Sequence, residues 1–281
     1  MSKAIIVLQT DFTRKEGAVA SMYGVIKSID RSIEIIDASH EIPKFDIWSA
    51  SYRLMQYVRF WPKGTIFVSV VDPGVGTSRK ISVAQTIDGY YILSPDNGTF
   101  SHILESSGID SIYEIDTDRH RLRGYDTETI SVFHGRDICA YVAALLASGK
   151  LSIEDVGKEY STKDIVMLPD LKPYTNEGII HGYIEITDPN FGNIWTNIPT
   201  SMFSDANITY GTILNVVIKH NDKVVLSEKV PYEASFGVVE EGELVVYKNE
   251  MNKIAFAISS GNLQEQYMLG YGLDWKIEFS R

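Results

Sequence analysis

The sequence predicts an α/β N-terminal domain with a mostly parallel sheet, followed by a C-terminal domain of antiparallel β-strands. Short β-branched runs alternate with amphipathic segments in the first half, while period-two runs dominate the second half. Between them, residues 163–177 contain two prolines and show no clear period, which is typical of a linker. We therefore expect one domain over residues 1–168 and another over residues 175–281.

The N-terminal elements follow from the spacing of their apolar residues. Val19, Met22 and Ile26 recur at three- and four-residue spacing and form one apolar helix face. By such patterns we expect strands at 4–8, 33–37, 65–71, 81–86 and 90–93, and helices at 17–29, 47–60, 100–105 and 136–147. Ser152 and Asp155 resemble a capping box and predict one more short helix. Strands and helices that alternate in this way form a mostly parallel sheet covered on both faces.

The C-terminal strands are predicted from alternating apolar and polar residues. We expect them at 179–186, 212–218, 224–226, 244–247 and 254–258. Turn-forming residues at 220–222 (HND) and 240–243 (EEGE) separate several of these runs. Such a series of short strands indicates a small barrel or a sandwich.

Composition and charge limit the class of protein. The 281 residues are 44% hydrophobic and can bury a large core. A net charge of -11 weighs against nucleic acid or an anionic membrane as partner, because both favour basic surfaces. No run approaches the roughly 20 apolar residues that span a bilayer, and the first apolar run is too short for a signal peptide. The single cysteine, Cys139, excludes an intrachain disulfide and is expected in the core, so we expect a cytoplasmic protein.

Polar side chains follow the predicted parallel strands. Asp11 closes the first strand, Asp37 and His40 follow the second, and Asp72 closes the third. Ligands bind beyond the carboxyl ends of such strands, so these side chains are candidates for one site. The glycine-rich loop at 73–76 that follows carries no bulky side chain. The alternative is that these aspartates cap helices or turns.

The segment FHGRD, residues 133–137, precedes the strongest predicted helix. His134 could be presented to a ligand there, because Gly135 lets the backbone approach closely. The alternative is a structural histidine near a helix N-terminus that Asp137 caps. Arg79, just beyond the glycine-rich loop, is either a site residue or a solvated arginine.

The segment DPNFGNIWTN, residues 188–197, stands out in the second half. Asp188 and Asn193 offer the acceptors and donors that ribose hydroxyls and a purine edge require. Phe191 and Trp195 offer flat faces for stacking. The alternative is an Asx-turn hairpin with its aromatic residues in the core.

Taken in order, these motifs resemble those of the S-adenosylmethionine hydroxide adenosyltransferases and the related fluorinase and chlorinase. The motifs are LQTDF (8–12), GVIKSI (24–29), IIDASHEIPKFDI (35–47), FVSVVDPGVGTSR (67–79), PDNGTF (95–100), FHGRD (133–137) and DPNFGNIWTNI (188–198). The resemblance implies an α/β domain followed by a β-barrel. It also implies a homotrimer with its site between neighbouring subunits, S-adenosylmethionine as substrate, adenosine as product, and neither a cofactor nor a metal.

The resemblance also assigns residues. Asp72, Arg79 and His134 match the Asp-Arg-His triad of the hydroxide-using branch, whereas the halogenating relatives carry other residues at these positions. The substrate-binding positions implied in the same way are Asp11, Phe45, Phe133, Asp188, Phe191, Asn193, Phe236, Ile258 and Ser260. Two segments depart from the family. Residues 13–16 (TRKE) replace a Gly-x-x-Asp pattern, and residues 250–252 (EMN) replace a serine-rich loop that helps to hold the methionine end.

The function expected from the sequence is hydrolysis of S-adenosylmethionine to adenosine and methionine. We expect His134 to accept a proton from water, Asp72 to orient the histidine or the water, and Arg79 to supply positive charge. One rival is a metal-dependent nucleoside hydrolase or phosphatase that uses Asp11, Asp37, Asp72 and His134. Another is a non-catalytic sensor of adenosine or S-adenosylmethionine, and a third has halide as the nucleophile.

Overall fold

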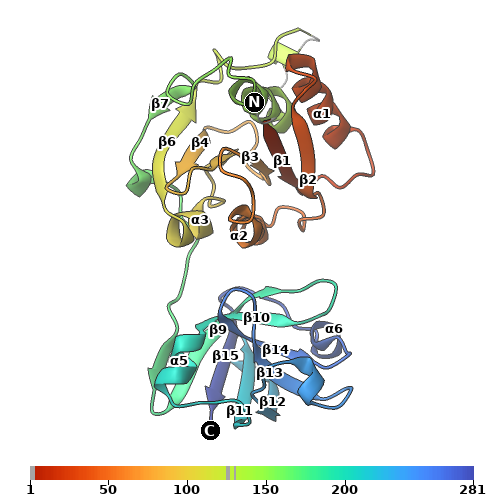
Figure 1. Ribbon diagram of the computed structural model, residues 1–281, viewed down its shortest axis with the longest axis vertical. Helices are drawn as coiled ribbons and strands as arrows, with labels where there is room; N and C mark the ends of the chain where they lie inside the picture. The colour runs from red at the N-terminus through yellow and green to blue at the C-terminus, as the bar shows by residue number, and fades with distance from the viewer. Residues whose placement is uncertain (1–3, 125–126, 130) are drawn as a thin grey trace. The chain divides into compact units, whose positions relative to one another are not determined.

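A computed structural model describes residues 4–124, 127–129 and 131–281. The chain divides into two compact units between Leu168 and Pro169 (Figure 1). Each unit has its own buried apolar core, so each is described separately. None of the helices within the described ranges is long and apolar enough to span a membrane.

The N-terminal unit contains a sheet with the strand order β2-β1-β3-β5-β4-β6-β7. Its strands are β1 (Ile5–Thr10), β2 (Glu34–Ser39), β3 (Ile66–Val70), β4 (Ile81–Thr86), β5 (Tyr91–Pro95), β6 (Ile109–Ile115) and β7 (Gly157–Glu159). The pairs β1–β2, β1–β3 and β3–β5 are parallel, whereas β4–β5, β4–β6 and β6–β7 are antiparallel. The short connection between β4 and β5 leaves no room for a crossover helix and imposes antiparallel pairing on these two strands. The expected α/β class is confirmed, with a mixed sheet.

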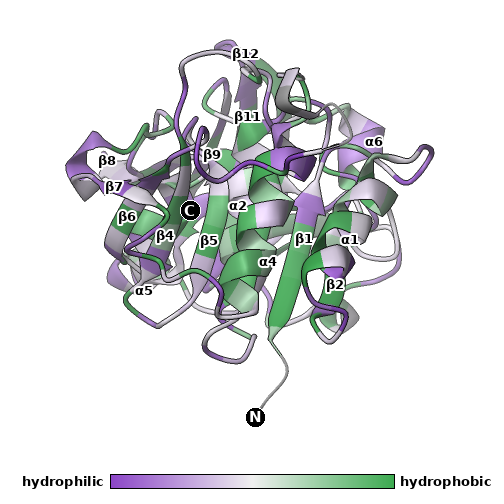
Figure 2. Ribbon diagram, turned by 90° about the horizontal axis from the view of Figure 1, so that it is seen from above, coloured by the Kyte–Doolittle hydropathy of each residue, from purple (hydrophilic) through white to green (hydrophobic). Residues whose placement is uncertain are grey.

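Helices cover both faces of this sheet. They are α1 (Ala18–Ile29), α2 (Ile47–Val58), α3 (Ser101–Ser106), a π-helix (Gly135–Ala140) continued by α4 (Tyr141–Ala147), and the 3₁₀ turns at Thr127–Thr129 and Thr162–Asp164. On one face, Met22 and Ile26 of α1 pack with Val142 of α4 against the β1 and β3 side chains. On the other face, Tyr57 of α2 contacts Phe67 of β3. Figure 2 shows β1 hydrophobic along most of its length, as a strand covered on both faces requires.

One predicted helix is wrong. Ser152 and Asp155 are joined by a side-chain hydrogen bond of 2.9 Å, but the segment is a turn that leads into β7. The Ser152 hydroxyl therefore binds the carboxylate that a capping box would direct to the backbone. Strand β6 was not expected.

The C-terminal unit is an antiparallel barrel with the strand order β12-β11-β15-β9-β10-β14-β13, and β8 pairs with β9. Its strands are β8 (Tyr174–Asn176), β9 (Ile179–Thr187), β10 (Ile194–Pro199), β11 (Ile213–His220), β12 (Lys223–Pro231), β13 (Leu244–Lys248), β14 (Lys253–Ile258) and β15 (Trp275–Ser280). Short helices are α5 (Thr200–Asp205), α6 (Leu263–Tyr267) and the 3₁₀ turn Phe236–Val238. A bridge between Tyr232 and Val246 nearly closes the sheet, so the barrel is confirmed.

The β11–β12 turn and strand β8 can be compared with the sequence predictions. Asn221 and Asp222 both have positive φ, of 48° and 64°, and form the predicted tight turn between β11 and β12. Strand β8 lies inside the segment expected to be a linker, where its three residues pair with β9. A three-residue strand is too short to leave a period in the sequence.

Candidate active site

The ends of β1 and β3 meet at one edge of the N-terminal sheet, as predicted for parallel strands. There Asp11 and Asp72 line a pocket of about 220 Å³. The other residues of its wall are Phe12, Lys44, Phe45, Val70, Val75, Val132, Phe133, His134 and Gly135. We call this the Asp11 pocket. It joins side chains from the first strand and from the FHGRD segment.

Asp72, Arg79 and His134 form one hydrogen-bonded group. Arg79 Nε donates to both carboxylate oxygens of Asp72 at 2.8 Å, and Arg79 Nη2 makes a further contact with Oδ2. Arg79 Nη2 also lies 3.0 Å from His134 Nδ1. Arg79 therefore stands between the carboxylate and the imidazole, and it is not the solvated arginine of the alternative interpretation. Asp72 acts on His134 through Arg79.

Arg121, which no sequence motif marks, is a second neighbour of His134. Its Nη2 lies 3.4 Å from His134 Nε2. The loop that carries it is tied to the FHGRD segment, because Leu122 N donates to Asp137 O at 2.8 Å. Guanidinium groups thus face both nitrogens of the imidazole.

This environment disfavours the charged form of His134. Burial lowers the pKa of His134, and the positive charges of Arg79 and Arg121 lower it further, against the opposing effect of Asp72 and Asp137. A guanidinium has only donors, and the shorter of the two contacts, 3.0 Å from Arg79, makes Nδ1 the acceptor, so Nε2 of the neutral ring carries the proton. The 3.4 Å contact with Arg121 is therefore electrostatic rather than a hydrogen bond.

The backbone at FHGRD is shaped for close packing. A Cβ on Gly135 would lie 3.2 Å from Val70 Cγ1 and 3.4 Å from the Phe12 ring. Phe12 and Phe133 also meet edge to face, with ring centroids 5.8 Å apart. Asp137 does not cap the helix, as the alternative supposed, but receives a 2.6 Å hydrogen bond from Arg136 Nε.

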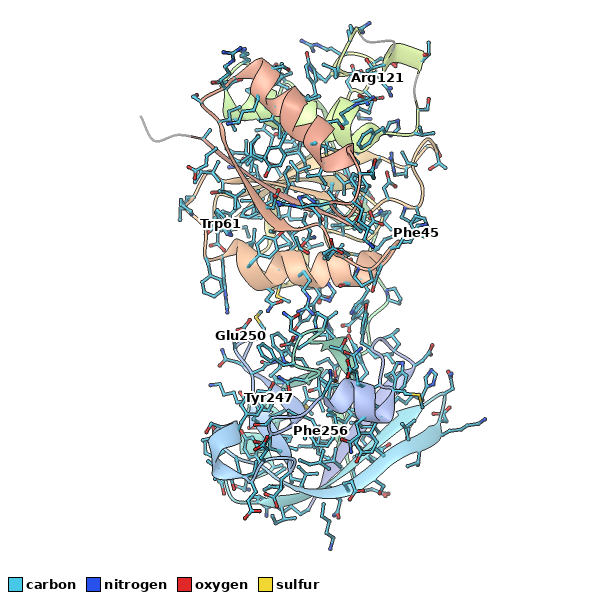
Figure 3. The ribbon with its side chains drawn as sticks, turned by 90° about the vertical axis from the view of Figure 1, so that its right-hand side faces the viewer. Phe45, Trp61, Arg121, Tyr247, Glu250 and Phe256 are labelled. Carbon is cyan, nitrogen blue, oxygen red and sulfur yellow. The ribbon has the colours of Figure 1, made fainter. Side chains whose placement is uncertain are left out.

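Asp11 is held by the loop that carries Phe45. Asp11 Oδ2 accepts a 2.9 Å hydrogen bond from Phe45 N. Phe45 has a φ of 66° and is 56% exposed (Figure 3). An aromatic residue in the left-handed region is uncommon, and an exposed one leaves a ring face free for a ligand. Lys44 Nζ lies 4.8 Å from the centre of that ring.

In the C-terminal unit, residues 188–193 form the turn between β9 and β10, and residues 194–197 begin β10. Asp188 Oδ1 accepts from Asn190 N at 3.0 Å and from Phe191 N at 3.3 Å, so the Asx turn is present. The alternative also placed both aromatic residues in the core. Trp195 is buried, as it required, but Phe191 is 67% exposed. The aromatic ring of Phe191 remains available for stacking.

The other predicted residues of this unit lie on adjacent loops. Gln264 N donates to Gly192 O at 2.9 Å, which joins the β9–β10 turn to α6, the helix that follows the loop containing Ser260. Ile258 is buried, whereas Phe236 is partly exposed and lies 4.6 Å, centroid to centroid, from the Tyr247 ring (Figure 3). Burial raises the pKa of Tyr247 to about 12, so its hydroxyl stays protonated.

The rival metal site is not assembled. Asp37 receives hydrogen bonds from Tyr23 and His40 and lies outside the wall of the Asp11 pocket. Across the described part of the chain, no three His, Cys, Asp or Glu side chains come together in a way that could hold a metal ion. Cys139 is buried, as expected, and burial raises the pKa of its thiol to about 12.

The two departures from the family pattern have defined structures. Thr13 has a φ of 56°, a conformation that glycine adopts without strain. Glu16 Oε1 accepts a 3.1 Å hydrogen bond from Ala18 N at the start of α1. Near residue 251, Asn249 Oδ1 accepts from Met251 N at 2.9 Å and closes the β13–β14 turn.

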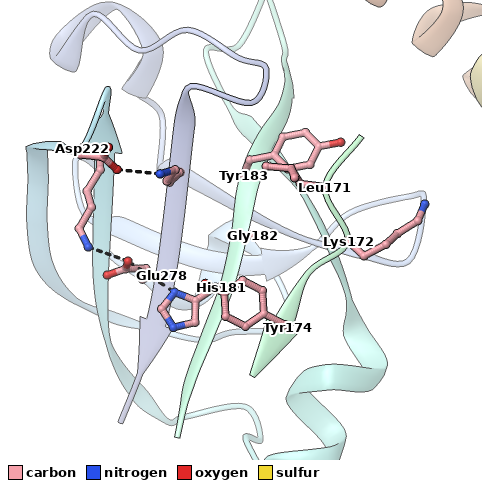
Figure 4. Close-up of a pocket in the computed structure, with 10 residues that line it drawn as sticks. Leu171, Lys172, Tyr174, His181, Gly182, Tyr183, Asp222 and Glu278 are labelled. Atoms are coloured by element: carbon pink, nitrogen blue, oxygen red, sulfur yellow. Dashed lines mark hydrogen bonds and ion pairs between the residues drawn. The ribbon is translucent and has the colours of Figure 1, made fainter. Parts of the chain in front are cut away.

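A second pocket, of about 340 Å³, lies on the face of β9, β15 and β11 opposite the barrel core (Figure 4). None of the residues predicted from the sequence lines it. Its charged side chains pair with each other, Lys219 with Glu278 at 2.6 Å and Lys276 with Asp222 at 2.7 Å. We assign it no role.

Comparison with known proteins matches the chain to two family models. Residues 6–157 match the SAM hydroxide adenosyltransferase N-terminal domain, and residues 182–276 match its C-terminal domain. The chain therefore belongs to the SAM hydroxide adenosyltransferase family, which is related to fluorinase.

Individual relatives agree with this placement. An (R)-S-adenosyl-L-methionine hydrolase of Methanocaldococcus jannaschii is 31% identical over 83% of this chain and 80% of its own. A fluorinase of Actinopolyspora mzabensis is 27% identical over 98% of this chain and 97% of its own. The crystal structure of an uncharacterized conserved protein from Thermotoga maritima is 34% identical and has a TM-score of 0.86. It covers 99% of this chain and 100% of that chain.

Proposed function

We propose that this protein hydrolyses S-adenosylmethionine in the cytoplasm, giving adenosine and L-methionine. The observation that carries the proposal is the bonded group of Asp72, Arg79 and His134 beside the Asp11 pocket. The hydroxide-using branch of the family is marked by this triad, while its halogenating relatives resemble the chain elsewhere but not at these positions. Water is thus favoured over halide as the nucleophile.

The substrate supplies its own leaving group. Water attacks the ribose C5′ in line with the C5′–S bond, a C–O bond forms, and the electron pair of the C–S bond leaves on sulfur. The sulfonium becomes a neutral thioether, so the leaving group needs neither a general acid nor a cofactor. The rest of the rate enhancement, beyond that from proton transfer, comes from aligning the attacking water with the C5′–S bond and from excluding bulk water.

The proton of the water is the main obstacle. Water has a pKa near 15.7 and histidine near 6.5, so ionising water first would cost about 9 units, or roughly 12 kcal/mol. Proton transfer concerted with attack avoids that intermediate. His134 accepts the proton at Nδ1. The hydrogen bond from Arg79 Nη2 to Nδ1 must therefore break first.

The remaining predicted residues bind the substrate in this proposal. Asp11 and Asp188 bind the ribose hydroxyls, and Asn193 reads the adenine. The exposed rings of Phe45 and Phe191 flank the nucleoside, with Phe133, Phe236, Ile258 and Ser260 completing the contacts. By the same resemblance, we infer a homotrimer in which Asp11 of one subunit works with Asp188 of its neighbour.

The test is incubation with S-adenosylmethionine in ¹⁸O-water, with and without a chelator, followed by mass spectrometry. Chelator-insensitive adenosine labelled at the 5′ oxygen, with equimolar methionine, supports the proposal. Loss of activity with the chelator would instead support the metal-dependent rival. Bound nucleoside without any product would identify a sensor.

The His134→Ala variant tests the role of the imidazole. We expect kcat to fall by about 10² to 10⁴, the usual contribution of a general base, while KM changes little. His102→Ala is the matched control, because His102 is also a buried histidine of the N-terminal unit but does not line the Asp11 pocket. Unchanged turnover in His134→Ala would contradict the assignment.

A further inference from the structure

Thr10, Asp37 and His40 form a buried hydrogen-bond chain beside the Asp11 pocket. His40 is 4% exposed and Thr10 is fully buried. His40 Nδ1 lies 2.8 Å from Thr10 Oγ1, and His40 Nε2 lies 2.8 Å from Asp37 Oδ1. Thr10 ends β1, and the other two residues belong to β2 and the turn after it. We call these three residues the His40 chain.

Every hydrogen bond of the His40 chain has a defined direction. A carboxylate only accepts, so His40 Nε2 donates to Asp37. Nδ1 of the neutral ring therefore accepts from the Thr10 hydroxyl. The hydroxyl oxygen in turn accepts from Phe12 N at 3.2 Å. Donors and acceptors match throughout when His40 is neutral, which is the condition for a stable buried network.

Asp37 is anchored on its other side. Tyr23 of α1 donates to Asp37 Oδ1 at 2.8 Å, and Arg14 forms an ion pair with Oδ2. Burial lowers the pKa of His40, Arg14 lowers it further, and Glu41 opposes both. Burial and Arg14 therefore favour the neutral ring that the hydrogen-bond geometry requires.

The His40 chain joins the two loops that carry Asp11 and Phe45. Thr13 N donates to His40 O at 2.8 Å, which adds a backbone link to the side-chain bonds. Asp11 follows Thr10 directly, and its carboxylate accepts from Phe45 N at 2.9 Å. A shift of His40 relative to Thr10 would therefore move Asp11 and Phe45 with respect to each other.

The hydrogen bonds link Thr10, His40 and Asp37 in the order of a hydroxyl–histidine–carboxylate triad, but a substrate cannot reach the hydroxyl. The Thr10 hydroxyl is fully buried and makes two hydrogen bonds within the chain, so no substrate reaches it. We propose that His40 is a positioning residue for nucleoside binding. It holds the Asp11 and Phe45 loops in the arrangement that binds the ribose. The proposal rests on the proposed function for the identity of the ligand.

The matched variants are Thr10→Val and Thr10→Ser. Valine has nearly the same shape but cannot bond to His40 Nδ1, whereas serine keeps the hydroxyl. We expect KM to rise about tenfold or more in Thr10→Val and in His40→Ala, as a buried group loses its partner. Thr10→Ser should stay near wild type. Because Asp72, Arg79 and His134 lie on other segments, kcat should change much less than KM.

His102→Ala is the control for a general structural effect. His102 is a buried histidine bonded to a hydroxyl, with its Nδ1 2.8 Å from Ser51 Oγ, between α2 and α3. The His102→Ala variant should lower the unfolding midpoint as much as His40→Ala does, but it should not raise KM. If Thr10→Val and Thr10→Ser have the same KM, or if His102→Ala raises KM as much as His40→Ala does, the proposal is overturned.

Adenosine binding, measured by calorimetry on the full-length protein, separates this proposal from the proposed function. If the wild type binds adenosine without hydrolysing S-adenosylmethionine, and Thr10→Val alone weakens binding, then His40 positions the site and the hydrolase assignment fails. If the wild type hydrolyses S-adenosylmethionine and Thr10→Val binds adenosine normally, the positioning role fails and the hydrolase assignment stands. A wild type that neither binds nor hydrolyses overturns both.

Discussion

At the scale of single residues, Arg121 adds to the effect of burial and of Arg79 in lowering the pKa of His134, and a pH profile can measure its share. The active form of the site has a neutral His134, since a protonated Nδ1 would face the Arg79 guanidinium. Activity should therefore fall as the pH drops through the lowered pKa of His134. In Arg121→Gln, one of the charges that lowers this pKa is gone, so the acid limb of kcat/KM should move to higher pH. At pH 8 the two proteins should be nearly equal.

Arg121→Lys provides the control because it keeps the charge and should keep the wild-type limb. An NMR titration of the His134 ring would show the same shift without relying on turnover. If the limb and the ring titration stay unchanged in Arg121→Gln, then Arg121 does not act on His134.

Arg79 could be predicted as a site residue from the sequence, whereas Arg121 could not. Arg79 belongs to a motif that resembles a family, and His134 stands beside a glycine before a strong helix. Arg121 lies in a polar stretch between Arg119 and Arg123, both exposed, and nothing local distinguishes it from them. Its position depends on the bond from Leu122 N to Asp137 O, which only the folded chain shows.

At the scale of elements, Asp96 ties the end of β5 to the segment that leads out of the N-terminal unit. Its Oδ1 accepts from Val166 N and its Oδ2 from Tyr160 Oη, both at 3.0 Å. Burial raises the pKa of Asp96, so the folded state favours the protonated carboxyl. This contribution to stability is complete below the unfolded pKa, near 3.9, and is lost as the pH rises through the folded pKa.

Asp96→Asn removes that pH dependence while its oxygen still accepts from Val166. We expect the unfolding free energy of Asp96→Asn to increase relative to wild type as the pH rises from 4 to 7, measured by urea unfolding. Asp118→Asn changes an exposed carboxylate and should show no such trend. Parallel pH curves for Asp96→Asn and the wild type would count against a buried, proton-favouring Asp96.

Elements were predictable where their residues repeat with one period. The helix at 17–29 was located within one residue because α1 buries a single periodic face. The strand at 81–86 was located because β4 is a short run, rich in β-branched residues, that is buried on both faces. Residues 136–140 were expected within a regular helix but belong to the π-helix Gly135–Ala140, since π and α turns use the same residue types. Strand β10 (IWTNIP) shows no clear alternation, and its pairing with β9 and β14 fixes it. Strand β15 (WKIEFS) does alternate, and the sequence prediction passed over that signal.

At the scale of the whole molecule, the residues proposed to act on the substrate are divided between the two units of the chain. Asp11, Asp72, Arg79 and His134 lie before Leu168, and Asp188 lies after Pro169. Each unit has a complete core of its own, so a substitution in one set of site residues should leave the fold of the other unit intact. The sequence motifs predict the site residues of each unit. No local pattern in the sequence, however, indicates whether a site combines two units of the same subunit or of neighbouring subunits.

Mixed trimers test that arrangement. His134→Ala and Asp188→Ala should each lose most activity, one through proton transfer and the other through ribose binding. In a cyclic trimer whose site combines one subunit with its neighbour, every mixed trimer has one site in which both residues are intact. Random mixing at equal amounts should then restore roughly one quarter of wild-type activity. If each site lies within one subunit, mixing restores nothing, because every copy carries one of the two defects. Co-expression with two different affinity tags, followed by light scattering to check for three subunits, makes the measurement direct.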